Sequence, residues 1–223
     1  MTVHDVARSL PDIPVLRDLC RSMAMVEAVL NPDGDTYYSF SATWSETDEI
    51  ASMNNGSGDE FHIIFSKAGA YVRGFDHESP MSPYVNDVPW PGVVDSVPQV
   101  FREHVVEPAF TDEGTPRATV CLWREAGSDR WQAGEIDFPD GYSDPDGADW
   151  MFQLLTAPTP EAFKEFAEDY YETAVDLDAV RRVYGLRPLD RQTVRALNST
   201  VSLKAVVDAA AGIGYPTDAD LSG

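Results

Sequence analysis

The order of strand-like and helix-like segments constrains the fold more than any other feature of the chain. Six segments have strand-like composition, at 36–44, 49–53, 60–66, 70–75, 117–124 and 130–138. Helix-like segments dominate after residue 149. Strands first and helices afterwards are typical of an α+β domain with an antiparallel sheet. We therefore predict one domain over 1–223, sheet-rich at 36–138 and helical at 149–212, with an N-terminal helix and about six strands.

The clearest hairpin joins the segments EFHIIFS and AYVRGF through the turn Lys67-Ala68-Gly69. Both segments are rich in β-branched and aromatic residues, and the glycine suits a tight turn. A second hairpin is predicted from 117–124 and 130–138, joined by Glu125–Asp129. The prolines of 79–98 predict an irregular connection between the two hairpins.

Helical periodicity and capping residues predict several helices. Apolar residues recur with helical spacing between Pro14 and Leu30. A second helix is expected at 97–106, and Thr159 followed by Pro160 has the pattern of a helix N-terminus. Three short helices are expected to begin at capping residues between apolar residues, and two of them to end at a glycine: the caps are Asp176, Asp190 and Ser202, and the glycines are Gly185 and Gly212.

Negative charge dominates the chain, with a net charge of −22 over 223 residues. No basic residue lies between Arg21 and Lys67, or between Arg130 and Lys164. Such a surface repels nucleic-acid phosphates and anionic membranes, and it attracts cationic proteins or metal ions. The alternative is a surplus of carboxylates that serves only solubility. The hydrophobic content of 43% argues for a globular protein, so the acidity does not indicate disorder.

The cysteines and the N-terminal segment predict a cytoplasmic protein. Cys20 and Cys121 are expected to be reduced thiols on core elements. The opening MTVHDVARSL lacks the apolar region of a secretion signal. No stretch approaches the length that spans a bilayer. The oligomeric state stays open.

One short segment, Asp76-His77-Glu78, follows a predicted strand and could act on a ligand. Carboxylates beside an imidazole bind metals or transfer protons near neutral pH, and His62 lies on the paired strand. A metal-assisted hydrolase that uses these residues is therefore one alternative. Adjacent residues of an extended chain point to opposite faces, however, which argues against a metal shared by Asp76 and His77. A polar turn, in which Asp76 and Ser79 bond local amides, is the favoured interpretation.

A second group of candidate residues lies in the acidic loop that precedes the helical part. Its carboxylates are Asp140, Asp144, Asp146 and Asp149. Their spacing fails as an EF-hand, because Tyr142 and Gln153 would occupy positions that need oxygen ligands such as carboxylates. With neither an HExxH pattern nor a spaced His/Cys set, we expect no metal and no cofactor. Trp90 and Trp150 are candidate exposed aromatic contacts, whereas Trp44, Trp123 and Trp131 are expected in the core.

Arginines gather in the C-terminal part of this acidic chain. They are Arg181, Arg182, Arg187, Arg191 and Arg195, and a helix-turn-helix pattern follows them weakly. A recognition helix should follow Gly212, but only a short segment remains there. The net charge also opposes an approach to DNA. We therefore expect no nucleic-acid partner, and we expect the arginines to pair with acidic groups of the same molecule or a neighbour.

The segment MNNGSGDEFHIIFSKAGAYVRGFDHESPMSPY resembles a family of uncharacterised bacterial cytosolic proteins. The stretches WPGVVDSVPQVF, EPAF, CLWREAGSDRW and AEDYYE carry the same resemblance, which runs from Tyr37 to Asn198. The resemblance implies no particular activity. Small acidic α+β proteins of this type are also similar in general character to immunity proteins of bacterial toxin systems, by analogy alone.

These observations favour a non-enzymatic, acidic protein-binding module, immunity-like, that neutralises a basic partner. Electrostatic attraction would accelerate the capture of such a partner. The expected contact elements are the loop Asp137–Asp149 and the loop 76–84. The expected binding residues are Asp76, His77, Glu78, Trp90, Asp140, Asp144, Asp146, Asp149 and Trp150.

Overall fold

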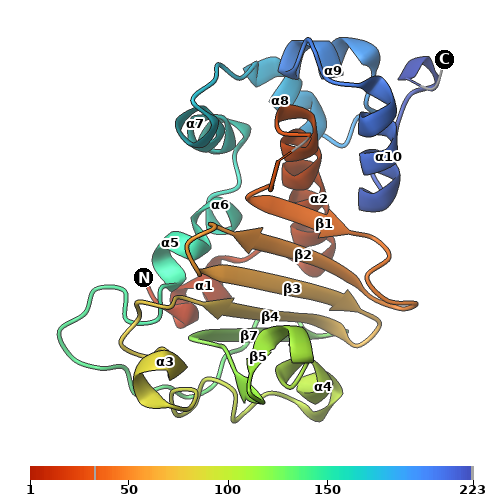
Figure 1. Ribbon diagram of the computed structural model, residues 1–223. Helices are drawn as coiled ribbons and strands as arrows, with labels where there is room; N and C mark the ends of the chain where they lie inside the picture. Colours follow the sequence, from red (N-terminus) through yellow and green to blue (C-terminus); the bar gives the residue numbers. More distant parts are fainter. Residues whose placement is uncertain (33, 222–223) are drawn as a thin grey trace. The chain divides into compact units, whose positions relative to one another are not determined.

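The computed structural model describes residues 1–32 and 34–221 and has the predicted α+β class (Figure 1). A five-stranded antiparallel sheet has the order β1-β2-β3-β4-β7, and a separate two-stranded sheet pairs β5 with β6. The strands are β1 Tyr38–Ser41, β2 Glu49–Asn54, β3 Glu60–Ser66, β4 Gly69–Phe75, β5 Thr111–Asp112, β6 Thr115–Pro116 and β7 Val120–Glu125.

Helices precede the sheet, lie in the connection between β4 and β5, and form the C-terminal part. They are α1 Val3–Ser9, α2 Ile13–Leu30, α3 Pro83–Asn86, α4 Arg102–Val105, α5 Ala148–Met151, α6 Gln153–Thr156, α7 Pro160–Tyr171, α8 Leu177–Tyr184, α9 Arg191–Leu197 and α10 Leu203–Ile213. Short 3-10 turns lie at Gln99–Phe101, Pro108–Phe110 and Ala219–Leu221. None of the helices in the described residues is long and apolar enough to cross a membrane.

The predicted helix starts are confirmed by their capping hydrogen bonds. The Thr159 side chain accepts from the amide of Ala162 at the start of α7, with Pro160 as the first helical residue. The other three caps also accept amide hydrogen bonds, at the starts of α8, α9 and α10: Asp176, Asp190 and Ser202. The predicted end of α10 at Gly212 is wrong. The helix continues to Ile213, and Gly214 ends it in the left-handed conformation with φ of 71°.

The hairpin of β3 and β4 is confirmed, but the second predicted hairpin lacks its second strand. β7 pairs with β4 instead, and of the segment 130–138 only Gln132 bridges to Trp123. The rest follows the 79–98 connection, because Gly134 and Gly92 allow their backbones to approach so closely that a Cβ on either would collide with the other segment. Trp44 also differs from expectation, since it follows β1 and is only half-buried. Trp123 and Trp131 are buried as predicted.

The chain divides into two compact units that interleave along the sequence. The first comprises Met1–Ile13 and Ser52–Thr156, and the second comprises Pro14–Ala51 and Ala157–Gly223. The division falls within β2, so it does not follow the sheet-rich and helical ranges of the sequence. The expectation of a single domain stays a prediction.

The first unit has its core on the strands β3, β4 and β7. Every residue of β4 is buried, as a central strand requires. The ring of Phe61 stacks on Phe152 at 5.1 Å between centroids, and Tyr71 packs on Phe101 at 6.2 Å. This rigid sheet fixes the positions of the residues that follow the ends of β3 and β4.

The second unit is built around α2. The Ser22 hydroxyl donates to the carbonyl of Val183 in α8, and Tyr38 packs on Phe163 of α7 at 6.3 Å. Cys20 is buried here as a free thiol, as is Cys121 in the first unit, which agrees with the predicted reduced state.

Candidate functional site

Three ionisable side chains converge where β3 begins and β4 ends. The register pairs Glu60 with Phe75, which places Asp59 opposite Asp76. His77 follows immediately, and one potential ligand atom from each of Asp59, Asp76 and His77 lies within 4.8 Å of the others. We call these three residues the hairpin-end cluster.

His77 is bonded twice to the buried carboxylate of Asp59. Its backbone amide donates to Asp59 Oδ1 at 2.9 Å, and its ring atom Nδ1 lies 2.6 Å from the same oxygen. The Asn55 side chain donates to Asp59 Oδ2 at 2.6 Å. The hydrogen bond with Asp59 raises the pKa of His77. Although burial alone raises the pKa of Asp59, the hydrogen bonds from His77 and Asn55 lower it below its usual value.

Asp76 belongs to a polar turn, as predicted. Its Oδ1 accepts from the amides of Glu78 at 2.9 Å and Ser79 at 3.1 Å, and the Ser79 hydroxyl accepts from the amide of Met81. The turn also changes the direction of the chain, so Asp76 and His77 are no longer consecutive residues of a strand. The alternation that argued against a metal shared by these two residues therefore does not apply, and one potential ligand atom of each lies within 4.8 Å of the other.

The four residues of the hydrolase alternative are not assembled together. His62 Nδ1 lies 3.3 Å from Arg73 Nη1, and its ring lies against Phe110 at 4.5 Å. Burial, followed by the charge of Arg73, lowers the pKa of His62 to about 4. Glu78 is exposed. Only Asp76 and His77 of the proposed set join a common cluster, and the sequence analysis missed Asp59.

Two arginines share one carboxylate beneath the neighbouring surface. Arg73, whose side chain is 2% exposed, lies 2.9 Å from Glu60, and Arg117 lies 3.1 Å from the same oxygen. Although burial raises the pKa of Glu60, the charges of the guanidinium groups lower it below its usual value. One carboxylate does not balance two guanidinium groups, so the three side chains together carry one positive charge.

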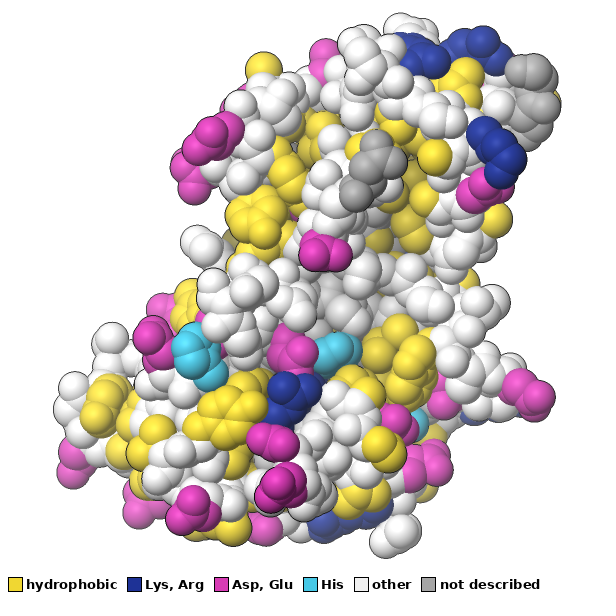
Figure 2. Space-filling view, in the orientation of Figure 1, with side chains coloured by type: hydrophobic (Ala, Val, Ile, Leu, Met, Phe, Trp, Pro, Cys, Tyr) yellow, Lys and Arg dark blue, Asp and Glu magenta, His cyan; other side chains and the backbone are white. Residues whose placement is uncertain are grey.

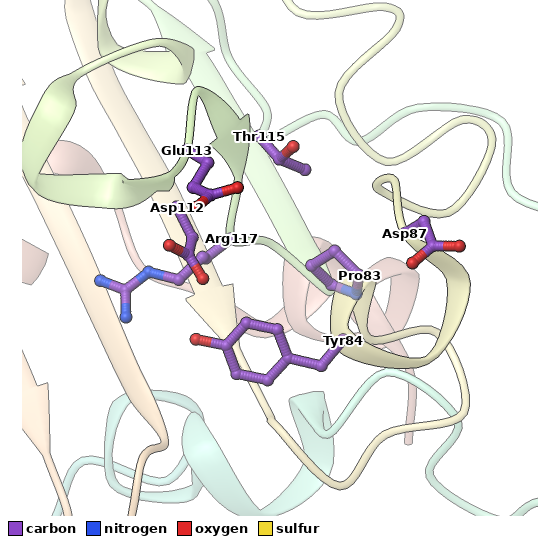
Figure 3. A pocket seen from close by; sticks show the side chains of 7 residues that line it. All are labelled: Pro83, Tyr84, Asp87, Asp112, Glu113, Thr115 and Arg117. Carbon is purple, nitrogen blue, oxygen red and sulfur yellow. The ribbon is translucent and has the colours of Figure 1, made fainter.

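A cavity of about 410 Å³ lies above this ion pair, and we call it the α3 pocket. It is lined by Pro83, Tyr84, Asp87, Asp112, Glu113, Thr115 and Arg117. Figure 3 shows Tyr84 on α3 and Asp87 directly after it, while Asp112 ends β5 and Glu113 lies in the turn between β5 and β6. The Asp112 carboxylate and the Tyr84 hydroxyl extend toward the same part of the cavity.

Local hydrogen bonds fix one wall of the α3 pocket, and a tight turn forms the other. Ser82 caps α3 by accepting from the amide of Tyr84, and Asn86 Nδ2 donates to the carbonyls of Pro80 and Ser82. On the opposite wall, Glu113 has a φ of 48° and Gly114 a φ of 84°. Two successive positive φ values are typical of the tight turn that closes a two-residue hairpin.

Large apolar side chains are exposed beside the pocket. Tyr84, Val85 and Val88 are 56%, 66% and 58% exposed. Figure 2 shows hydrophobic and acidic side chains side by side on the lower part of this face, around a basic side chain. Exposed large apolar side chains that lie close together in the sequence and have charged neighbours favour a protein-binding site here.

The predicted acidic loop presents only part of its carboxylates. Asp140 and Asp149 are exposed and Asp144 is half-buried, but Asp146 is fully buried and cannot contact a partner. Burial, reinforced by the nearby charge of Asp144, raises the pKa of Asp146 to about 7. Trp150 is exposed and donates from Nε1 to Asp76 Oδ2 at 3.1 Å.

The other predicted aromatic contact, Trp90, is half-buried, and its Nε1 donates to the carbonyl of Asp137.

The C-terminal arginines pair largely within their own unit. Arg181 lies 2.6 Å from Glu161, and Arg182 lies 2.5 Å from Asp190.

The missed residues carried weak sequence signals. Asp59 could have been found by counting the register back from the turn at Gly69, which places residue 59 opposite residue 76. The pocket residues Asp112 and Glu113 lie in a hairpin of two-residue strands, too short for an alternating pattern. The sequence signal for this hairpin was Glu113 followed by Gly114, a pair that suits a tight turn.

No protein-family model, curated protein or solved structure matches the chain significantly. The resemblance that the sequence suggests therefore stays an expectation.

Proposed function

We propose that the protein is a non-enzymatic, acidic binding module that captures a basic protein partner at the α3 pocket. The observation that carries the proposal is the set of three exposed carboxylates around one cavity: Asp87, Asp112 and Glu113. A guanidinium or ammonium group that enters this cavity meets negative charge on both walls. The single arginine of the lining, Arg117, is held by Glu60, which also pairs with Arg73, so the three carboxylates of the lining have to outweigh its positive charge.

The surroundings of the pocket support a protein as the source of that basic group. The exposed ring of Tyr84 provides a face for a cation–π contact. Val85 and Val88 add apolar surface that a macromolecular partner can cover and a small cation cannot. The loop 76–84, an expected contact element, contributes Pro83 and Tyr84 to the lining. Neutralisation of a basic, toxin-like protein in the cytoplasm, as an immunity protein would do, is the biological form of this proposal.

A labelled arginine-rich peptide and its citrulline counterpart test the pocket directly. Citrulline keeps the shape of arginine but lacks the charge. We expect saturable binding of the arginine peptide, weaker binding as salt rises, and no saturation with the citrulline peptide. The double substitution Asp112→Asn/Glu113→Gln should weaken binding about tenfold, which corresponds to about 1.4 kcal/mol. Fluorescence anisotropy at low and high salt measures both effects.

A matched control removes two exposed carboxylates of the same unit elsewhere. Glu125→Gln/Asp129→Asn changes the net charge equally at the β7 turn. This variant should bind the arginine peptide within about twofold of the unchanged protein, because attraction by distant exposed charges is screened. Equal losses in the two double variants would show that only the net charge acts, and the α3 pocket would not be the docking site.

A further inference from the structure

We propose that the hairpin-end cluster of Asp59, Asp76 and His77 binds a divalent transition-metal ion of the Zn²⁺ type. The three side chains come from two strand ends whose relative positions are fixed by the register of β3 and β4. Their potential ligand atoms already lie within 4.8 Å of one another. This site is separate from the α3 pocket, and the proposal does not depend on the binding of a basic partner.

Residues outside the cluster hold both carboxylates in place. Asn55 donates to Asp59 Oδ2 at 2.6 Å, and Trp150 donates to Asp76 Oδ2 at 3.1 Å. Such outer hydrogen bonds orient the carboxylates that bind metals and increase metal affinity. Gly147 leaves the space that Asp76 occupies, since a Cβ there would lie 2.5 Å from Asp76 Oδ2. The position of the Asp76 carboxylate is therefore set by Trp150 and Gly147 as well as by the amides of its own turn.

The ligand types favour a transition metal over Mg²⁺ or Ca²⁺. Two carboxylates and one imidazole suit Zn²⁺, Mn²⁺ or Co²⁺, whereas Ca²⁺ takes six to eight oxygen ligands. Metal bonds of about 2.0–2.2 Å place neighbouring ligand atoms roughly 3–4 Å apart. Small side-chain rotations within the 4.8 Å limit would reach that spacing. The His77 side chain is 35% exposed, which leaves a path from solvent.

Without an ion, the hydrogen bond from His77 to Asp59 holds the same groups together. This bond explains the approach of the two residues without a metal, so a binding measurement has to decide. The ion would take the place of the shared proton between the imidazole and Asp59. Asp76 then distinguishes the two interpretations, because it would be a ligand of the ion but has no part in the hydrogen bond between His77 and Asp59.

Zn²⁺ and Mg²⁺, titrated separately into the full chain by calorimetry, test the proposal. We expect one saturable Zn²⁺ site, no comparable Mg²⁺ site, and a visible absorption band when Co²⁺ replaces Zn²⁺. His77→Gln and Asp76→Asn should each weaken Zn²⁺ binding at least about tenfold. The control His4→Gln/Asp140→Asn removes an imidazole and a carboxylate elsewhere in the same unit and should leave the affinity within about twofold.

Four results would overturn the site: no saturation at millimolar Zn²⁺, unchanged affinity in His77→Gln, unchanged affinity in a folded Asp76→Asn, or an equal loss in the control variant. Asp59→Asn is not used, because the buried Asp59 carboxylate also holds Asn55 and the His77 amide, and its loss could unfold the unit. If Asp76→Asn fails to fold, His77→Gln and the Co²⁺ spectrum of the unchanged protein still decide the question. A failed metal titration would leave the peptide-binding test of the α3 pocket unaffected.

Discussion

Each of the two compact units buries one carboxyl group that joins distant parts of its sequence, and the two groups are held in different ways. In the first unit, Asp146 accepts from the amide of Val3 at Oδ2 and from the amide of Ala148 at Oδ1. In the second unit, Glu27 accepts from the amide of Tyr37 and from the hydroxyl of Tyr171, both at Oε2. Among the described residues, Glu27 Oε1 has no partner. Asp146 therefore uses both of its oxygens, and Glu27 uses one.

The two groups nevertheless share a physical environment and a topological role. Burial raises the pKa of each to about 7. Asp146 bonds to Val3, which lies 143 positions earlier in the chain, and Glu27 bonds to Tyr171, which lies 144 positions later. A buried polar group that bonds two distant segments specifies how they meet, because any other arrangement leaves its partners unsatisfied. The difference in oxygen use predicts how each group responds to substitution.

The largest expected effect is the loss of stability on Asp146→Asn. A carboxamide offers one acceptor oxygen, so either the Val3 or the Ala148 amide would face an amino group in a buried site. We expect the free energy of unfolding to fall by about 2–3 kcal/mol. Glu27→Gln keeps one oxygen for both of its donors and should cost less than about 1 kcal/mol at pH 6. Urea unfolding of both variants measures the difference. Equal losses would show that the number of hydrogen-bonded carboxyl oxygens does not decide the cost of the substitution.

The sequence predicts the local structure around these groups but not their burial. The caps Asp176 and Asp190 were predictable because an N-cap depends on its own helix. Asp146 is different, since it lies among exposed or half-buried acids such as Asp144 and Asp149. Its contact with Val3 depends on a segment far away in the chain, and nothing in the local pattern marks that contact. Glu27 equally looks like a polar residue of an amphipathic helix.

The candidate sites show the same division between local and distant information. Asp76 and His77 were predicted from their neighbours, whereas Asp59 depends on strand register. The α3 pocket requires the pairing of α3 with a hairpin almost thirty residues later, so its lining could not be read from composition. The acidity led to the hypothesis of a basic partner, and only the fold located the cavity.

The second prediction concerns pH and isolates Glu27. Its pKa is raised from 4.5 to about 7, so its contribution to stability is complete below pH 4.5 and is lost as the pH rises through 7. Between pH 5 and pH 8, the unchanged protein should lose about 2 kcal/mol more stability than Glu27→Gln. Asp146 acts in the same direction in both proteins and cancels. If the free energies of unfolding of the two proteins changed in parallel with pH, the raised pKa of Glu27 would be contradicted.

His62 provides an opposite effect within the first unit. Its pKa is lowered to about 4, so its contribution is complete above pH 6.5 and is lost as the pH falls toward 4. It is present in both proteins of the previous comparison and does not alter the difference between them. It does reduce the total pH dependence of the unchanged protein, which is why the difference between variants is the quantity to measure.

The third prediction removes one donor from Glu27. Tyr171→Phe loses the hydroxyl and should lower the free energy of unfolding by about 1 kcal/mol. Because the hydroxyl lowers the pKa of Glu27, the substitution should also move the stability loss to higher pH. Tyr170→Phe is the matched control, since its ring is exposed. A double-mutant cycle with Glu27→Gln should give a coupling energy for Tyr171 and none for Tyr170.

The smallest effects are expected at exposed carboxylates, which compare the two units at their surfaces. Asp12→Asn removes the partner of Arg124 in the first unit, where only the arginine is largely buried, and should cost at most about 0.5 kcal/mol. Asp208→Asn removes the exposed partner of Lys204 on α10 and should leave the thermal midpoint unchanged within error. A loss at Asp208 as large as that at Asp146 would mean that burial does not set the importance of a carboxylate in this protein. Differential scanning calorimetry at low and high salt tests this, because any surface contribution should disappear as salt rises.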